Sequence, residues 1–218
     1  MKQINPRSGW FSAPGPEQDI VVSSRIRLAR GCAGYVYPRF LSMGEADVFR
    51  ERAAEAMDRV FPSAGRLDLD ELSEDERRVL MERNLVPTDL EASDGADLYV
   101  GADERLSVLV NVGDHFRFVG LAPGLALSEL YREVADLAGQ VDELVPFAAS
   151  LEFGYLTSEL ENLGTGLRAS TMLHLPALQE TGLLPSALKM VSSQEVVVKA
   201  FGKDVESSQG GMYQLANR

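Results

Sequence analysis

Residues 96–120 constrain the fold of this chain more than any other stretch of its 218 residues. They read ADLYVGADERLSVLVNVGDHFRFVG, which is three short runs rich in β-branched and aromatic residues, separated by turn-forming residues. Runs joined by so few residues predict an antiparallel meander. Elsewhere, helical and strand-like segments alternate without the regular βαβ rhythm of a parallel sheet. The sequence therefore predicts the α+β class, with helices ahead of, and packed on, an antiparallel sheet.

The other segments follow from periodicity and from helix-start signals. Ser42 with Glu45, and Ser73 with Glu76, form capping boxes that predict two helices, with a linker or edge strand between them. A third helix is predicted from the apolar spacing within residues 123–149. Further predictions are a strand beginning near residue 19, strands over 167–175, 195–201 and 212–215, and a helix over about 177–190. We expect an extended lead-in over 1–18 and one domain over 19–218, helical over about 40–90 and sheet-rich over about 95–218.

Composition excludes several classes of protein. The formal net charge is −12, which argues against nucleic acid or an anionic membrane as a partner, while remaining compatible with a cationic substrate. One cysteine, Cys32, and two histidines cannot form a disulfide or a structural zinc site. His115 and His174 lie in segments with strand-like sequence patterns and are predicted to have structural roles. No signal-peptide pattern or run of 18 apolar residues is present, so a cytoplasmic location is expected.

Basic side chains recur where strands begin or end. Arg25 and Arg27 are two residues apart on a predicted strand and therefore share a face. Arg117 lies in the meander, and Arg168 follows the turn Gly164–Thr165–Gly166, whose glycines could present N–H groups to an anion. Lys199, Lys203 and Asp204 are predicted in a glycine-containing loop near the end. Several cations in an otherwise acidic chain predict a polyphosphate pocket.

The segments GPEQDIVVSSRIRLAR, NVGDHFRF, GYLTSELENLGTGLRASTMLHLPAL and GGMYQLAN occur in this order along the chain. Together they resemble the ATP:guanidino phosphotransferase family, with the bacterial protein-arginine kinases as the nearest branch. The resemblance covers roughly residues 10–217. It implies a small helical region followed by a curved antiparallel sheet flanked by helices. It also implies transfer of the γ-phosphoryl group of MgATP to a guanidinium nitrogen, with arginines holding the phosphates.

The resemblance assigns ATP or ADP contacts residue by residue, and Mg²⁺ is expected to be held through the phosphates rather than by the protein. The nucleotide-binding positions it implies are Ser23, Ser24, Arg25, Ile26, Arg27, Arg117, Arg168, Ala169, Ser170, Thr171, Met172, Lys199 and Lys203.

The chain departs from the family pattern where the family places its chemistry. The family sequence is Asn-Glu-Glu-Asp-His where this chain has Asn111-Val112-Gly113-Asp114-His115. Gly113 therefore occupies the position of the family's catalytic glutamate. We do not expect Asp114 to replace it, because a one-residue step on a strand points to the opposite face. Glu159 stands at the family cysteine. Lys199-Ala200 occupies the position of an Arg-Gly pair of the family. Asp204 occupies the position of the family's substrate-binding glutamate, and Asn84 that of a family histidine.

Three hypotheses follow. The first is a nucleotide-binding, pseudokinase-like domain in which phosphoryl transfer is weak or lost. The second is an active arginine or protein-arginine kinase with a rearranged site, in which Glu159 and Asp204 are the catalytic carboxylates. The third is an interaction module that no longer binds nucleotide. The arginines that this chain shares with the family argue against it. Expected partners are nucleotide, free arginine or protein arginine side chains, and a protein partner or a second copy of the chain.

Overall fold

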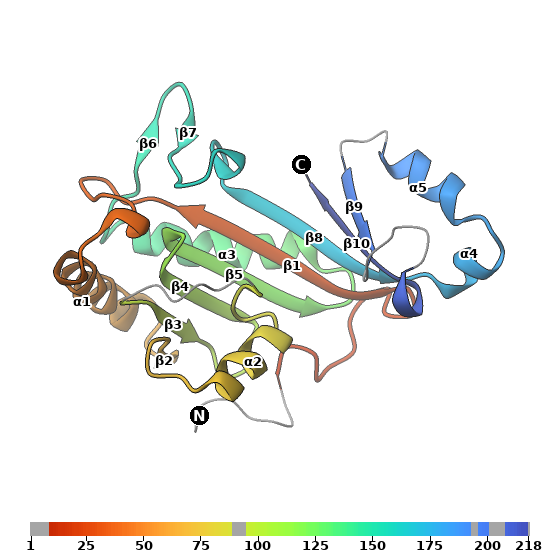
Figure 1. Cartoon of the computed structure of the whole chain (residues 1–218), viewed down its shortest axis with the longest axis horizontal. Helices are drawn as coiled ribbons and strands as arrows, with labels where there is room; N and C mark the ends of the chain where they lie inside the picture. The colour runs from red at the N-terminus through yellow and green to blue at the C-terminus, as the bar shows by residue number, and fades with distance from the viewer. Residues whose placement is uncertain (1–8, 89–94, 193–195, 201–207, 218) are drawn as a thin grey trace.

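The computed structural model describes residues 9–88, 95–192, 196–200 and 208–217. Its centre is an eight-stranded sheet with the strand order β2-β3-β4-β5-β1-β8-β10-β9 (Figure 1). Every neighbouring pair in it is antiparallel. The strands are β1 (Val21–Arg30), β2 (Gly65–Asp68), β3 (Asp97–Val100), β4 (Leu106–Val112), β5 (Asp114–Pro123), β8 (Leu167–His174), β9 (Val196–Ala200) and β10 (Met212–Asn217). The predicted meander is therefore β3, β4 and β5, and the α+β class is confirmed.

Five α-helices lie in the described residues: α1 (Met43–Val60), α2 (Glu74–Glu82), α3 (Leu127–Asp142), α4 (Pro176–Glu180) and α5 (Leu184–Ser192). Both predicted capping boxes are formed, at Ser42 and at Ser73. The single helix predicted over about 177–190 is wrong, because two helices lie there. Gly182 separates them with a φ of 69°, which a helix cannot accommodate.

The segment between α1 and α2 is the edge strand β2, one of the two alternatives that the sequence left open. A small hairpin, β6 (Ala149–Ser150) and β7 (Gly154–Tyr155), was not predicted, and it follows α3. Single-turn 3₁₀ helices occur at η1 (Pro38–Phe40), η2 (Leu160–Asn162) and η4 (Gln209–Gly211). No helix in the described part of the chain is long and apolar enough to cross a membrane.

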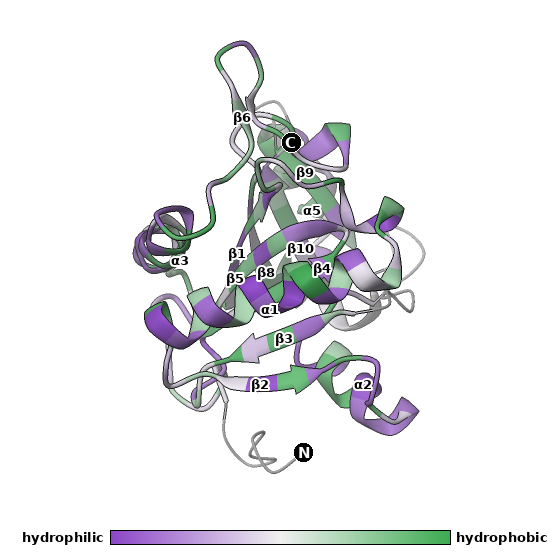
Figure 2. Cartoon of the chain, turned by 90° about the vertical axis from the view of Figure 1, so that its left-hand side faces the viewer, coloured by the Kyte–Doolittle hydropathy of each residue, from purple (hydrophilic) through white to green (hydrophobic). Residues whose placement is uncertain are grey.

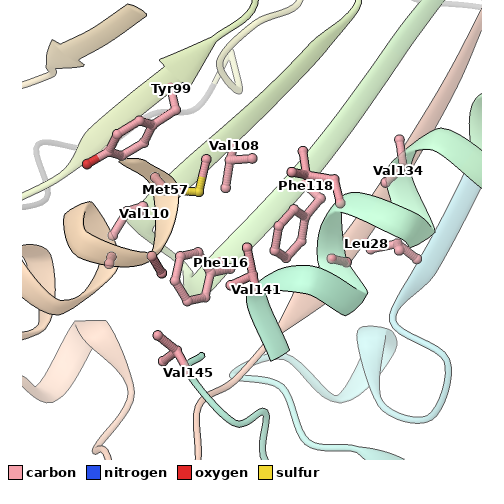
Figure 3. Packing of buried hydrophobic residues seen from close by; sticks show 14 of the residues in the cluster. Leu28, Met57, Tyr99, Val108, Val110, Phe116, Phe118, Val134, Val141 and Val145 are labelled. Atoms are coloured by element: carbon pink, nitrogen blue, oxygen red, sulfur yellow. The ribbon is translucent and has the colours of Figure 1, made fainter. Parts of the chain in front are cut away.

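The main hydrophobic core lies between one face of the sheet and the helices α1 and α3. Phe116 and Phe118 of β5 point toward Met57 of α1 and Val134 of α3 (Figure 3). A Cβ at Gly120 would lie 2.6 Å from the side chain of Val134, so only glycine lets α3 pack this closely. The outer side of α3 is hydrophilic (Figure 2), as expected for a helix with one buried face.

A second core lies on the opposite face, at one end of the sheet. Leu98, Leu109 and Val119 pack there with Leu80 of α2, and Trp10 is packed against the cluster. The Trp10 indole N–H donates to the carbonyl of Arg83 at 3.0 Å. In Figure 1, no described helix crosses the near face of β1 and β8, while α3 lies behind them. This uncovered part of the sheet carries the predicted basic side chains.

Candidate anion-binding site

Strand register places four arginines on one face of the sheet, opposite α3. Arg25 and Arg27 are two residues apart on β1 and share a face. Arg27 pairs directly with Arg168 of β8, and Ala29, on the same face of β1, pairs directly with Arg117 of β5. Directly opposed residues of an antiparallel pair project to the same side. We call Arg25, Arg27, Arg117 and Arg168 the arginine face.

The electrostatics of the arginine face favour an anion. The pKa of Arg25 is lowered to about 9, first by burial and then by the charges of Arg27 and Arg117. Its Nε atom is buried and has no hydrogen-bond partner in the described part of the chain. Among the described residues, no ion pair joins Arg25, Arg117 or Arg168 to a carboxylate. Clustered guanidinium groups of this kind repel one another, and a polyanion bound among them would relieve that repulsion.

Further predicted positions share this face. Met172 pairs with Ser23 and, on its other side, with Gln214 of β10. The Gln214 amide donates to the Ser170 hydroxyl at 3.2 Å. Lys199 of the edge strand β9 pairs directly with Gln214 of β10, so its side chain lies on the same face. It is exposed to solvent. It lies on β9, within the strand predicted over 195–201, so that prediction is confirmed for Lys199 and the placement of Lys199 in the glycine-containing loop is wrong.

Four predicted positions project to the opposite face. The Ser24 hydroxyl donates to the Gly124 carbonyl at 2.7 Å and accepts from the Ala126 N–H, which fixes the turn before α3. Ile26 lies in the main core. Ala169 pairs directly with Ile26, and Thr171 with Ser24. The side chains of these four residues therefore cannot contact a ligand on the arginine face. Lys203 and Asp204 lie outside the described residues.

The glycine turn before Arg168 is fixed to its neighbours. The Gly164 N–H donates to the Tyr155 carbonyl at 3.1 Å, so this N–H does not face a ligand, contrary to the expectation from sequence. Gly166 has a φ of 60°, and a Cβ there would lie 2.5 Å from the Ala29 carbonyl oxygen. Arg30 projects to the α3 side of β1 and donates to the Thr165 carbonyl at 2.9 Å. Its guanidinium carbon lies 3.7 Å from the centre of the Tyr155 ring.

The turn between β4 and β5 brings Arg117 close to Gly113. Gly113 has a φ of 73°, and a Cβ there would lie 2.9 Å from Nη2 of Arg117. The next residue, Asp114, is fully buried, and its Oδ1 accepts the Ser158 N–H at 2.6 Å. Burial is the first cause that raises the pKa of Asp114. Asp114 therefore holds the Ser158 loop against the sheet instead of filling the position of Gly113.

Glu159 follows that anchored residue and is exposed. Its carboxylate accepts from the Asn162 side chain at 3.1 Å, and its carbonyl accepts from the Thr157 hydroxyl at 2.8 Å. The charge of Glu159 contributes to the raised pKa of Asp114, so the two carboxylates are neighbours. Glu159 thus lies in the loop that Asp114 holds against the sheet.

The buried histidine is structural, in agreement with the prediction. The His115 Nδ1 accepts the Cys32 N–H at 3.1 Å, and Nε2 lies 3.0 Å from the Val36 carbonyl, which requires the proton on Nε2. Burial lowers the pKa of His115 to about 4, so the ring is neutral at pH 7. No group of three potential metal ligands is found among the residues with described positions.

Three contributors to the site were not predicted from the sequence: Gln214, the Asp114–Ser158 contact and the close approach of Arg117 to Gly113. Gln214 could have been predicted from the sequence. Alternate residues of a strand share a face, and counting back by twos from the end of the last strand places Gln214 on the face that carries Ser170. The approach of Arg117 to Gly113 depends on a left-handed turn, and the Asp114–Ser158 contact depends on a loop 44 residues away. Neither can be predicted from a local sequence pattern.

Comparisons with known proteins agree with the fold. Residues 50–218 match the model of the family described as ATP:guanido phosphotransferase, C-terminal catalytic domain. The chain is 38% identical to a protein-arginine kinase of Desulforamulus reducens, over 98% of this chain and 62% of that protein. It is also 38% identical to one of Moorella thermoacetica, over 99% of this chain and 63% of that protein. The chain thus spans about six-tenths of the length of these relatives.

Solved structures share the fold at lower identity. A lombricine kinase superposes with a TM-score of 0.77 at 20% identity, over 98% of this chain and 66% of that one. A duplicated taurocyamine kinase from Schistosoma mansoni with bound transition state analog components gives 0.79 at 22% identity. That match covers 97% of this chain and 32% of that one. At these identities the likeness concerns the fold alone.

Proposed function

Because the chain belongs to the ATP:guanido phosphotransferase family, we propose that its arginine face binds the phosphates of ATP or ADP, and that phosphoryl transfer to arginine is weak or lost. The observation that carries the binding part is the buried, unpaired Nε of Arg25 beside two further cations. A nucleotide phosphate chain supplies several negative charges to such a cluster and accepts bidentate hydrogen bonds from each guanidinium.

The residues of the face have distinct roles in this proposal. Arg25 lies among the cations and would hold the phosphates, while Arg27 and Arg168, directly opposed on β1 and β8, would flank them. Ser170, oriented by Gln214, would add a hydroxyl. Mg²⁺ would be held through the phosphates, since the described residues contain no acidic cluster for it. The bound cation would offset the charge on the phosphate oxygens.

The weak-transfer part rests on the turn at Gly113. A guanidinium acceptor needs a carboxylate to orient it and remove its proton, and a general base contributes about 10²- to 10⁴-fold. Gly113 has no side chain, and a Cβ added there would lie 2.9 Å from Nη2 of Arg117. A second guanidinium brought to the same place would be repelled. The nearest buried carboxylate, Asp114, is engaged by Ser158.

Restoring an acid at this position tests that argument. We expect Gly113→Glu to yield no phosphoarginine and to weaken ADP binding, because the new side chain displaces Arg117. The left-handed backbone should also lower the free energy of unfolding by about 1–3 kcal/mol. Gly139→Glu is the control, since nothing lies within 4 Å of a Cβ at Gly139 in α3, and we expect it to be neutral or stabilising. Phosphoarginine formed by Gly113→Glu, detected by mass spectrometry without acid, would refute the steric account.

The lowered pKa of Arg25 predicts a pH dependence of binding. As the pH rises through about 9, free Arg25 loses its proton, and binding must then restore it. The affinity for ADP, measured by calorimetry, should fall about tenfold between pH 8 and 10. The unfolded chain keeps this proton to higher pH, so the contribution of Arg25 to the free energy of unfolding rises as the pH increases above about 9. Arg25→Met should lack this rise in the free energy of unfolding, measured by urea unfolding at several pH values, and an unchanged rise in that variant would assign it to another group.

The alternative is an active arginine or protein-arginine kinase that uses Glu159 and Asp204. Two observations favour it: the relatives with 32–38% identity are named protein-arginine kinases, and Asp114 fixes the backbone next to Glu159. Mass spectrometry without acid, after incubation with MgATP and either free arginine or an arginine-containing protein, separates the two proposals. Phosphoarginine formed by the wild type but not by Glu159→Gln supports the alternative. Nucleotide affinity unchanged in Arg168→Ala would favour a pure interaction module instead.

A further inference from the structure

The last residue of β1, Arg30, is a buried cation on the face of the sheet that packs against α3. It follows Ile26 and Leu28 on that face, and both belong to the main core. Arg30 itself is 6% exposed, and burial is the first cause that lowers its pKa. Among the described residues, no carboxylate forms an ion pair with it. A charge in such a place is costly unless other groups compensate it.

Two main-chain carbonyls and one aromatic ring provide that compensation. Nη1 of Arg30 donates to the carbonyls of Ala29 and Thr165, at 2.7 and 2.9 Å. The guanidinium carbon lies 3.7 Å from the centre of the Tyr155 ring, well within the range of a cation–π contact. The contacts of Arg30 therefore join the end of β1 to the turn before β8 and to β7 (Figure 1).

The turn before β8 has room for the Arg30 guanidinium because it contains a glycine. A Cβ at Gly166 would lie 2.6 Å from Nη1 of Arg30, so a side chain there would displace the guanidinium. The Gly166 carbonyl accepts the Ala29 N–H at 2.9 Å, which ties the same turn to β1. Arg168 is the second residue of β8 and lies three positions after Thr165. The place where Arg30 holds the backbone is thus close in the chain to an arginine of the opposite face.

We propose that Arg30 is a positioning residue of the arginine face: it holds the Thr165 carbonyl from the α3 side of the sheet and thereby fixes Arg168 opposite Arg27. This inference rests on the proposed function, because it takes Arg168 to contact a nucleotide phosphate. Arg30 does not contact the ligand, since its side chain lies on the other face. Without its guanidinium the turn loses a charged donor, and a backbone shift of about 1 Å is enough to weaken contacts that depend on close placement.

Calorimetry with MgADP on Arg30→Met tests this inference, since methionine fills the apolar length of the side chain and cannot donate to Thr165. We expect ADP binding about 5- to 20-fold weaker than in the wild type, and a loss no larger than that in Arg168→Ala. In the Arg168→Ala background, Arg30→Met should change the affinity by less than about twofold, because its effect passes through Arg168.

The same replacement in a Lys199→Ala background shows whether the coupling is specific. Lys199 lies on β9, two strands from β8, so there the full loss caused by Arg30→Met should persist. A loss of equal size in the Arg168→Ala background would show a general structural effect and would overturn the proposal.

Tyr155 supplies a milder test, which decides the question even where Arg30→Met does not fold. Tyr155→Leu removes the ring against which the guanidinium lies, and we expect ADP binding about 3- to 10-fold weaker, again with no further loss in the Arg168→Ala background. Tyr155→Phe keeps the ring and should retain the wild-type affinity within about twofold. Equal affinities of the Leu and Phe variants would contradict a positioning role for the Arg30–Tyr155 contact.

Arg77→Met is the matched control. Arg77 of α2 also donates to a main-chain carbonyl, that of Leu69 at 2.8 Å, at the β2 edge of the sheet. Its replacement should lower the urea midpoint and leave ADP affinity within about twofold of the wild type. ADP binding that is equal in the wild type and in Arg30→Met overturns this inference alone. Absence of ADP binding in the wild type overturns the proposed function, and this inference with it.

Discussion

Replacement of Arg25 by methionine should weaken ADP binding about 30- to 5,000-fold, because truncating one partner of a buried charge pair costs about 2–5 kcal/mol. The same change should raise the free energy of unfolding by about 1 kcal/mol, since a buried charge without a partner is exchanged for an apolar side chain of similar length. Burial and two neighbouring cations already lower the pKa of Arg25 to about 9. Opposite signs for binding and stability would identify Arg25 as a residue kept for its ligand.

The control for Arg25→Met is Arg132→Met on the exposed side of α3. It removes one positive charge from the molecule without touching the arginine face, and both quantities should change little. The affinity comes from calorimetry with MgADP, and the stability from urea unfolding. A less than threefold loss of affinity in Arg25→Met would contradict the assignment of Arg25 to the phosphate site.

Asp97→Ala should lower the free energy of unfolding by about 3–5 kcal/mol, the cost of removing one partner of a buried ion pair. Asp97 is fully buried where β3 meets β2 and α1. Arg50 of α1 donates to both of its oxygens, at 2.9 and 2.8 Å, and Arg66 of β2 donates at 2.7 Å. Hydrogen bonding to Asp97 is the first cause that raises the pKa of Arg50 and of Arg66. Without the carboxylate, the partly buried Arg50 keeps only Asp68.

An exposed ion pair of the same helix is the matched control. Arg52 and Glu55 lie 3.3 Å apart with side chains 51% and 65% exposed, so Glu55→Ala should cost less than about 0.5 kcal/mol. Both variants are measured by urea unfolding at pH 7. Similar losses for the two substitutions would show that the Asp97 network does not hold α1 to the edge of the sheet.

Much of the fold and part of the site followed from short-range patterns. Period-two alternation places Arg25 and Arg27 on one face, and the strand register shows this arrangement. The capping boxes at Ser42 and Ser73 set the helix starts, because the signal is complete within four residues. The resemblance to the family then supplied the grouping with Arg117 and Arg168, which lie about 90 and 140 residues farther along the chain.

The remaining features depend on contacts that no local pattern encodes. The left-handed conformation of Gly113 matters because Arg117 folds back onto it, and a glycine alone does not specify that approach. The direction of Asp114 could be argued from strand alternation, but its partner, Ser158, lies in a loop after α3. Ser24 and Ile26 were grouped with Arg25 by resemblance, although alternation already sends their side chains to the α3 face.

Titration of MgADP into the wild-type chain by isothermal calorimetry is the most direct test that the arginine face binds nucleotide phosphates. We predict saturable heat with one site per chain, displacement of a fluorescent ATP analogue, and loss of both in Arg25→Met. Absence of heat and of displacement in the wild type would contradict the account.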